Sequence, residues 1–209
     1  MITKDNHFLI ILSAPSGGGK STILNEILKV TNDIDYSVSY TTRSPRGTEQ
    51  NGIHYHFVTE EEFQRRIDEG DFLEYAKVFG NWYGTSKSFI KDRLEKKHHV
   101  ILDIDVQGAS LISATDIPYV KIFILPPSME VLHQRLVLRA TDSEEEIAKR
   151  LQIAKDEVAY IPQYDYLVIN DKLDIAVQDV LAIIRAEENR VCRYNHPAMD
   201  FISTGEKDD

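Results

Sequence analysis

The sequence predicts an α/β fold built on a parallel β-sheet, and two observations support that prediction. Short apolar runs alternate with amphipathic helical patterns along the chain, and a glycine-rich segment follows the first run directly. Nearly continuous apolar runs suit parallel strands that helices cover on both faces. The predicted strands lie at residues 8–12, 100–106, 119–125 and 166–169. A chain of 209 residues can bury one sizeable core and has room for inserted subdomains.

Amphipathic helices are predicted between and after these strands. Residues 21–28 and 129–136 carry apolar side chains at helical spacing. Ser143 and Glu146 form a capping box before another helix, and a further helix starts at about Leu173. Strands that alternate with helices in this way favour a parallel sheet, with the glycine-rich segment at the end of its first strand.

The glycine-rich segment, residues 13–22, reads S-A-P-S-G-G-G-K-S-T and predicts a cradle for phosphate groups. The glycines leave room for backbone N–H groups to turn toward one anion, and the positive end of the following helix dipole faces the same point. Lys20 is expected to reach the β- and γ-phosphates of a nucleotide, and the Ser21 hydroxyl to bind Mg²⁺. The predicted contacts are Ala14, Pro15, Ser16, Gly17, Gly18, Gly19, Lys20, Ser21 and Thr22.

One position departs from the usual pattern G-x-x-x-x-G-K-[ST], because Ala14 stands in place of its first glycine. That glycine mostly eases a turn, so the change removes no chemical group. The alternative is a glycine-rich loop before an ordinary helix. The order of strand, G-K-S-T and amphipathic helix favours the phosphate loop.

The composition limits the classes of partner. The chain has 24 basic and 34 acidic residues, and a formal charge of -10 disfavours nucleic acid and anionic membranes. A small phosphorylated metabolite needs only a few converging arginines. Cys192 is the only cysteine, which excludes an internal disulfide and a thiolate metal site. With no separable signal peptide and no apolar run near ~18 residues, the expected location is the cytoplasm.

Residues 36–85 break the α/β pattern. Segments 36–40 and 54–58 alternate like exposed strands, Thr59 begins a short helix, and residues 72–85 read as two more strands. We therefore expect a mostly antiparallel insertion at 36–85 and, around an acidic stretch, a small lid at 139–150. The core then comprises residues 1–35, 86–138 and 151–209 of a single domain.

The insertion carries S-Y-T-T-R-S-P-R at residues 39–46, and here the chain resembles the guanylate kinase family. The resemblance extends from Phe8 to about Ala186. It includes V-I-L-D-I-D-V-Q-G at 100–108, the P-P-S-x-x-x-L turn and V-I-N-D at 168–171. The pairing of T-T-R-x-x-R with the phosphate loop is far more specific than either motif alone.

The resemblance implies a P-loop NTPase-type core and transfer of the γ-phosphoryl group of ATP to GMP, with Mg²⁺ as cofactor and dGMP as a second substrate. It implies that Ser39, Arg43, Arg46, Tyr55 and Tyr83 bind the phosphate of GMP, and that Glu74, Thr85 and Asp103 lie at or near the guanine. The residue chemistry agrees, because arginine forks suit a phosphate and one carboxylate accepts both adjacent donors of guanine. Adenine presents an acceptor at the same ring nitrogen, which Glu74 would repel.

For the transfer step, the resemblance makes Arg139 and Arg150 the lid arginines that act with Lys20 and Arg43. It also places Arg135 and Asn170 at the ATP site, with Arg135 on the adenine. Transfer of a phosphoryl group requires cations near the γ-phosphate, and a charged helix face is the alternative for these arginines. Asp103 and Asp105 end a predicted strand near the loop. One or both orient waters on Mg²⁺, and that division stays open.

Two other functions remain as alternatives. A catalytically inactive guanylate-kinase-like module would bind a protein partner, but such modules typically lose a working phosphate loop. A P-loop kinase for another small phosphate would have no purpose for Glu74 and Thr85. No particular protein partner is indicated.

Overall fold

The computed structural model describes residues 3–4, 6–78, 80–112, 115–138 and 143–195. Its centre is a five-stranded sheet in the order β10-β9-β2-β8-β3, in which every pair of neighbours is parallel. The strands are β2 (Leu9–Ser13), β3 (Ile34–Tyr36), β8 (His99–Asp103), β9 (Tyr119–Leu125) and β10 (Tyr166–Ile169). The predicted parallel α/β core is confirmed.

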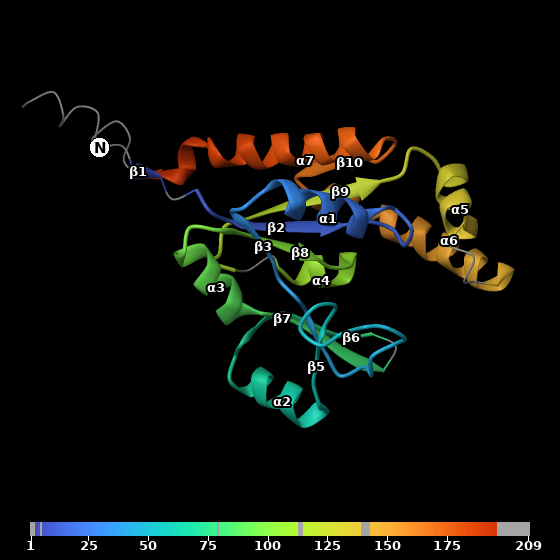
Figure 1. The fold of residues 1–209 in the computed structure, drawn as a ribbon, viewed down its shortest axis with the longest axis horizontal. Helices are drawn as coiled ribbons and strands as arrows, with labels where there is room; N and C mark the ends of the chain where they lie inside the picture. The colour runs from blue at the N-terminus through green and yellow to red at the C-terminus, as the bar shows by residue number, and fades with distance from the viewer. Residues whose placement is uncertain (1–2, 5, 79, 113–114, 139–142, 196–209) are drawn as a thin grey trace, which may run out of the picture.

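Helices cover both faces of this sheet, as Figure 1 shows. On one face lie α1 (Lys20–Val30) and α7 (Leu173–Glu188), and on the other lie α3 (Lys87–Glu95) and α4 (Val106–Leu111). Successive side chains of β2 therefore enter different cores: Ile10 and Leu12 belong to one buried cluster, and Leu9 and Ile11 to the other. A strand buried on both faces needs an uninterrupted apolar run.

Two more helices stand beyond the carboxyl ends of β2 and β9, at the right of Figure 1: α5 (Met129–Leu138) and α6 (Glu144–Val158). They pack through Leu132, Leu136, Ile147 and Ala154. The predicted capping box is confirmed, because the Ser143 Oγ accepts from the backbone N–H of Glu146 and the Glu146 carboxylate accepts from that of Ser143. Residues 139–142 lie outside the described residues.

The insertion forms a second, four-stranded sheet in the order β5-β4-β7-β6, and its helix α2 (Glu60–Asp68) lies at the bottom of Figure 1. Pairs β4–β7 and β6–β7 are antiparallel, whereas β4–β5 is parallel. The strands are β4 (Tyr40–Thr41), β5 (His56–Phe57), β6 (Phe72–Val78) and β7 (Asn81–Ser86). The second sheet is therefore mixed.

Two predicted strand boundaries were wrong. Residues 36–40 do not form one strand of the insertion, because Ile34–Tyr36 pairs in parallel with β8 and β4 begins only at Tyr40. The strand predicted at 100–106 ends at Asp103, since the Asp105 carboxylate accepts from the backbone N–H of Gly108 (2.7 Å) and so caps α4. A strand cannot continue through a helix cap. Asp105 instead lines the cavity over the glycine-rich segment, residues 13–22.

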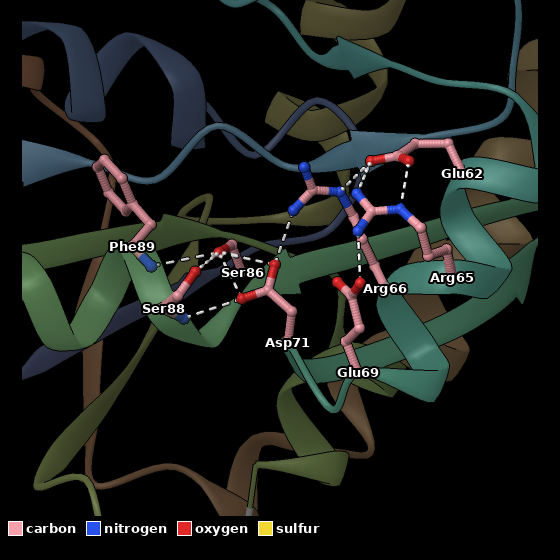
Figure 2. Close-up of polar contacts among 8 residues, drawn as sticks. All are labelled: Glu62, Arg65, Arg66, Glu69, Asp71, Ser86, Ser88 and Phe89. Atoms are coloured by element: carbon pink, nitrogen blue, oxygen red, sulfur yellow. Dashed lines mark hydrogen bonds and ion pairs between the residues drawn. The ribbon is translucent and has the colours of Figure 1, made fainter.

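A polar network joins the insertion to the core where β7 meets α3 (Figure 2). The Asp71 carboxylate accepts from Arg66 Nη1 (2.8 Å), the Ser86 hydroxyl (3.3 Å) and the backbone N–H of Ser88 (3.2 Å). Ser86 in turn caps α3 by accepting from the N–H of Phe89 (3.2 Å). One carboxylate thus links the helix of the insertion to a helix of the core.

The first and last described strands of the chain lie side by side. The short strand β1 (Thr3–Lys4) pairs antiparallel with β11 (Tyr194–Asn195), and two 3₁₀ helices occur at η1 (Ile161–Gln163) and η2 (Val191–Arg193). Arg193 donates to the nearly buried carboxylate of Glu187 (3.1 Å). Residues 187–195 therefore complete α7 and pair with residues 3–4 near the start of the chain.

Candidate active site

The phosphate loop connects β2 to α1, and its glycines are required by its backbone. Gly17 and Gly19 have φ values of 90° and 94°, a region that other residues rarely adopt. A Cβ at Gly19 would lie 2.2 Å from Asn170 Nδ2. That amide donates to the carbonyl oxygen of Gly18 (2.8 Å), so a side chain on the strand-end of β10 holds the loop in shape.

Lys20 and Ser21, the first residues of α1, both contact Asp103 at the end of β8. Lys20 Nζ lies 2.5 Å from Asp103 Oδ1 and donates to the carbonyl oxygen of Ile104 (3.0 Å). The Ser21 hydroxyl donates to Asp103 Oδ2 (3.2 Å). The ammonium, hydroxyl and carboxylate groups are thus gathered at one point beside the loop.

A cavity of about 340 Å³ opens beside the loop on the side of α5 and α7. Arg135 lies in its wall and donates from Nη2 to the carbonyl oxygen of Asn170 (2.8 Å). A partly apolar hollow with one oriented guanidinium is a suitable place for a flat heterocycle. Its lining residues are Gly17, Gly19, Thr22, Arg135, Leu138, Asn170, Asp171 and Leu173.

A second cavity, of about 360 Å³, lies between the core and the insertion. The core contributes Lys20, Asp103 and Asp105, and the insertion contributes residues from β6, from β7 and from the segments just before β4 and β5. Residues more than 80 positions apart in the sequence therefore face one space. The full lining is Lys20, Ser39, Tyr55, Glu74, Ala76, Val78, Tyr83, Gly84, Asp103, Ile104, Asp105 and Gly108.

Glu74 is the most buried carboxylate of this cavity, with 8% of its surface exposed. Burial raises its pKa to about 7, which the charge of Asp105 reinforces and a hydrogen bond from Thr85 opposes. Thr85, on the neighbouring strand β7, donates its hydroxyl to Glu74 Oε1 (2.6 Å). A Cβ at Gly108 would lie 3.3 Å from Glu74 Oε2, so glycine there leaves the second oxygen room.

Arg43 and Arg46 lie in the turn after β4 and are not among the residues that line the cavity. Both Arg43 Nη atoms donate to the carboxylate of Glu49 at 2.9 Å, and the backbone N–H of Arg46 donates to it at 2.7 Å. These bonds lower the pKa of Glu49 to about 2. The Arg43 guanidinium carbon lies 5.3 Å from the ring centre of Tyr55, which does line the cavity. A carboxylate thus occupies the arginine fork near the cavity.

Comparison with known proteins identifies the family of the chain. The guanylate kinase family model matches residues 6–187, which is most of the chain. The chain belongs to the guanylate kinase family. A guanylate kinase of Clostridium perfringens strain ATCC 13124 is 48% identical over 193 residues, covering 92% of this chain and 89% of the relative. A guanylate kinase of Vibrio parahaemolyticus is 51% identical over 181 residues, covering 86% and 87%.

A solved guanylate kinase also matches the fold. The crystal structure of guanylate kinase from Anaplasma phagocytophilum has a TM-score of 0.79 and 32% identity, and the match covers 100% of both chains. The region matched by the family model, residues 6–187, contains the phosphate loop, the insertion and α6. In the described part of the chain, no helix is long and apolar enough to cross a membrane.

The lid predicted at 139–150 lies partly outside the described residues. Arg139 lies outside the described residues, whereas Arg150 is half-buried on α6. Residues 143–150 belong to the same continuous helix as residues 151–158. The second half of the predicted lid is therefore the amino-terminal half of a longer helix.

Two residues near the guanylate kinase site were missed by sequence reasoning. Glu49 pairs with Arg43, and Glu157 lines a cavity of about 280 Å³ over the phosphate loop. Glu157 stands two helical turns after Arg150, which puts both side chains on one face of α6. This spacing could have indicated from the sequence that Glu157 lies near the site. For Glu49 the sequence offers only a charge close to two arginines.

Proposed function

We infer that the chain catalyses transfer of the γ-phosphoryl group of ATP to GMP, giving ADP and GDP. The observation that carries this inference is one cavity with Lys20 of the phosphate loop on one side and the buried Glu74 of the insertion on the other. An ammonium that neutralises phosphate and a carboxylate that accepts from a base edge suit two nucleotides placed head to head. Such positioning is most of what phosphoryl transfer requires from a protein.

On the donor side, the amides of the loop cradle the phosphates and Lys20 exchanges Asp103 for the β- and γ-phosphates of ATP. Ser21 and Asp103 offer a hydroxyl and a carboxylate 3.2 Å apart, which suits Mg²⁺ because that ion keeps several waters and binds substrate phosphates. Clusters of three or more His, Cys, Asp or Glu that could hold a metal are absent from the described residues. Mg²⁺, when bound there, would neutralise charge on the transferring group.

On the acceptor side, Glu74 accepts from the two adjacent donors of guanine while Thr85 keeps its side chain oriented. Ser39, Tyr55 and Tyr83 direct hydroxyl groups toward the phosphate of GMP, and Arg43 exchanges Glu49 for that phosphate. A phosphate dianion competes well for this fork, because it offers more charge and more acceptor oxygens than one carboxylate. Arg46 adds a second cation, and dGMP fits the same contacts to base and phosphate.

For the transfer step, we propose that Arg139 and Arg150 close over the site with the lid at 139–150, while the insertion at 36–85 closes from the other side. Closure brings cations to the equatorial oxygens of the phosphoryl group and excludes water, which would otherwise accept it. We expect the enzyme to act on free nucleotides in the cytoplasm. Scattering that records no compaction with GMP and a non-hydrolysable ATP analogue would contradict the closure.

A coupled assay that measures ADP formation with GMP, AMP, CMP and UMP tests the assignment. We expect turnover with GMP and little with the other three. Turnover with a different small phosphate would support the alternative of another P-loop kinase. Tight GMP binding without any turnover would support a binding module, whereas the intact set Lys20, Ser21 and Arg43 favours the enzyme.

A further inference from the structure

Glu157 lies at the phosphate loop, but none of the steps above uses it. Among the described residues, the cavity over the loop is lined by residues 14–21 and, from elsewhere in the sequence, by Asp105 and Glu157. Glu157 belongs to the last turns of α6, a helix from the opposite end of the sequence. A carboxylate is the least expected group in a space built to receive phosphate.

The surroundings of this carboxylate are those of a partly buried anion. Its Oε2 atom is buried and makes no hydrogen bond with the described residues. Burial raises the pKa of Glu157, and the charge of Asp105 adds to that effect. The backbone of Ser16 and the ammonium of Lys20 act in the opposite direction. The backbone N–H of Ser16 and the nearby charge of Lys20 therefore favour the ionised form of Glu157, and its buried Oε2 atom lacks a partner among the described residues.

A polyphosphate entering the cavity would need the same groups. Phosphate loops bind anions through backbone N–H groups and the lysine of the motif. Two anions in one small cavity repel each other, and removal from bulk water strengthens that repulsion. The Glu157 carboxylate and the terminal phosphates of ATP therefore compete for the backbone N–H of Ser16 and the ammonium of Lys20.

The packing around α6 connects this competition to the lid. Leu132 and Leu136 of α5 contact α6 residues in a buried cluster. A Cβ at Gly17 of the loop would lie 2.9 Å from a methyl carbon of Leu136, so α5 rests directly on the loop. Arg150 is two turns from Glu157 on the same helix. Any movement of α6 that accompanies displacement of Glu157 would therefore also move Arg150.

We propose that Glu157 is a resident anion of the phosphate loop, which the terminal phosphates of ATP displace when they bind. This proposal rests on the assignment of the loop to ATP. Glu157 then sets the affinity for the polyphosphate part of the nucleotide and has no direct effect on the adenine or on GMP.

The test is calorimetric binding of ATP and of tripolyphosphate, without metal, to wild type and to the Glu157→Gln variant. Glutamine keeps the volume and an acceptor for the Ser16 amide but removes the charge. We expect both ligands to bind the variant about ten-fold more tightly, and GMP to bind equally well. The matched control is Asp156→Asn, which removes the same charge from an exposed neighbouring position and should leave affinity within about two-fold.

Unchanged or weaker binding of ATP and tripolyphosphate to Glu157→Gln would overturn the proposal. An equal gain in Asp156→Asn would also overturn it, because the effect would then come from overall charge. A Glu157→Ala variant should show the same gain, which covers the case in which glutamine disturbs the fold. Failure of wild type to bind ATP at all would instead overturn the assignment of the loop, and the proposal with it.

Discussion

The proposed donor and acceptor sites of this molecule would bind phosphate groups in different ways. The donor region is one continuous loop whose anion-binding groups are backbone amides, and its shape depends on glycines with positive φ. The acceptor region has no such loop, and its polar groups are side chains from separate strands and turns. A backbone site can be encoded in ten consecutive residues. A side-chain site exists only after distant segments have folded together.

The two regions share one feature: each key cation already has a carboxylate partner. Lys20 pairs with Asp103 at 2.5 Å and Arg43 pairs with Glu49 at 2.9 Å. A charged group near a cavity is costly to leave unpaired, so a resident carboxylate keeps it oriented before the substrate arrives. We therefore propose that substrate binding on both sides exchanges one anion for another.

The largest effect is expected on the donor side, from Lys20→Ala. The loop amides remain, but the cation that reaches the transferring group is lost, so kcat should fall by about 10²- to 10³-fold. The fold should persist, because Lys20 contacts only polar groups at the edge of the cavity. Steady-state kinetics with ATP and GMP measure the change. Lys29→Ala, on an exposed site of the same helix, is the control, and near-normal turnover in Lys20→Ala would refute the donor assignment.

On the acceptor side, Glu74→Gln should stabilise the protein without nucleotide. The folded-state pKa of Glu74 is about 7 against an ordinary value of 4.5, so between these pH values the unfolded chain ionises first and the free energy of unfolding falls. Above pH 7 the loss levels at about 3 kcal/mol. Denaturant melts at pH 5 and pH 8 should show a gain for the variant that grows with pH. An equal gain at both values would mean that burial of the charge is not the cause.

The lid arginine should affect turnover more than binding. Arg150→Met removes a cation proposed to meet charge that develops in the transition state, so kcat should fall by roughly 10- to 100-fold with little change in the KM of GMP. Arg139→Met should behave in the same way. The adjacent exposed Lys149→Met is the matched control. Lower affinity for GMP with unchanged turnover would place these arginines in ground-state binding.

The smallest effect expected is a pH dependence of the acceptor side alone. Only ionised Glu74 accepts both donors of guanine, so affinity for GMP should rise about ten-fold from pH 6 to pH 8 as the carboxyl group deprotonates. Titration of the GMP phosphate contributes too, and Glu74→Gln isolates that part. Calorimetry on both proteins gives the difference. Identical pH profiles of GMP affinity in wild type and variant would show that Glu74 does not contact the base. The affinity for ATP should not change with pH in this way.

The same contrast explains what the sequence could predict. The phosphate loop, four of the five core strands and the capping box of α6 are local patterns, and the structure contains each of them. Ile34–Tyr36 was not predicted as a core strand, and Tyr36 was assigned to the insertion, because a three-residue strand with one buried position resembles an exposed edge strand. Its place is decided by pairing with β8, some 65 residues later in the chain, and no local pattern encodes that partner.

Sequence reasoning missed two residues of the site because they belong to no motif and are recognised only by their contacts in the folded chain. Glu157 reaches the loop from 141 positions beyond Ser16, and Glu49 is visible only as one acid among many in an acidic chain. The raised pKa of Glu74 also depends on burial between β6, β7 and α4, which a sequence does not show. The family resemblance predicts the role of Glu74, whereas its raised pKa follows only from its burial in the fold.

The most direct test of the account is the ratio of kcat/KM for GMP to that for AMP, measured on wild type and Glu74→Gln. The amide keeps the volume but offers one acceptor and a competing donor, so GMP should lose a charge-assisted hydrogen bond and its kcat/KM should fall roughly ten- to a hundred-fold. The new NH₂ group can donate to the acceptor nitrogen of adenine, so the GMP-to-AMP ratio should fall as well. An unchanged ratio would remove Glu74 from the base site and contradict the assignment of the acceptor cavity to GMP.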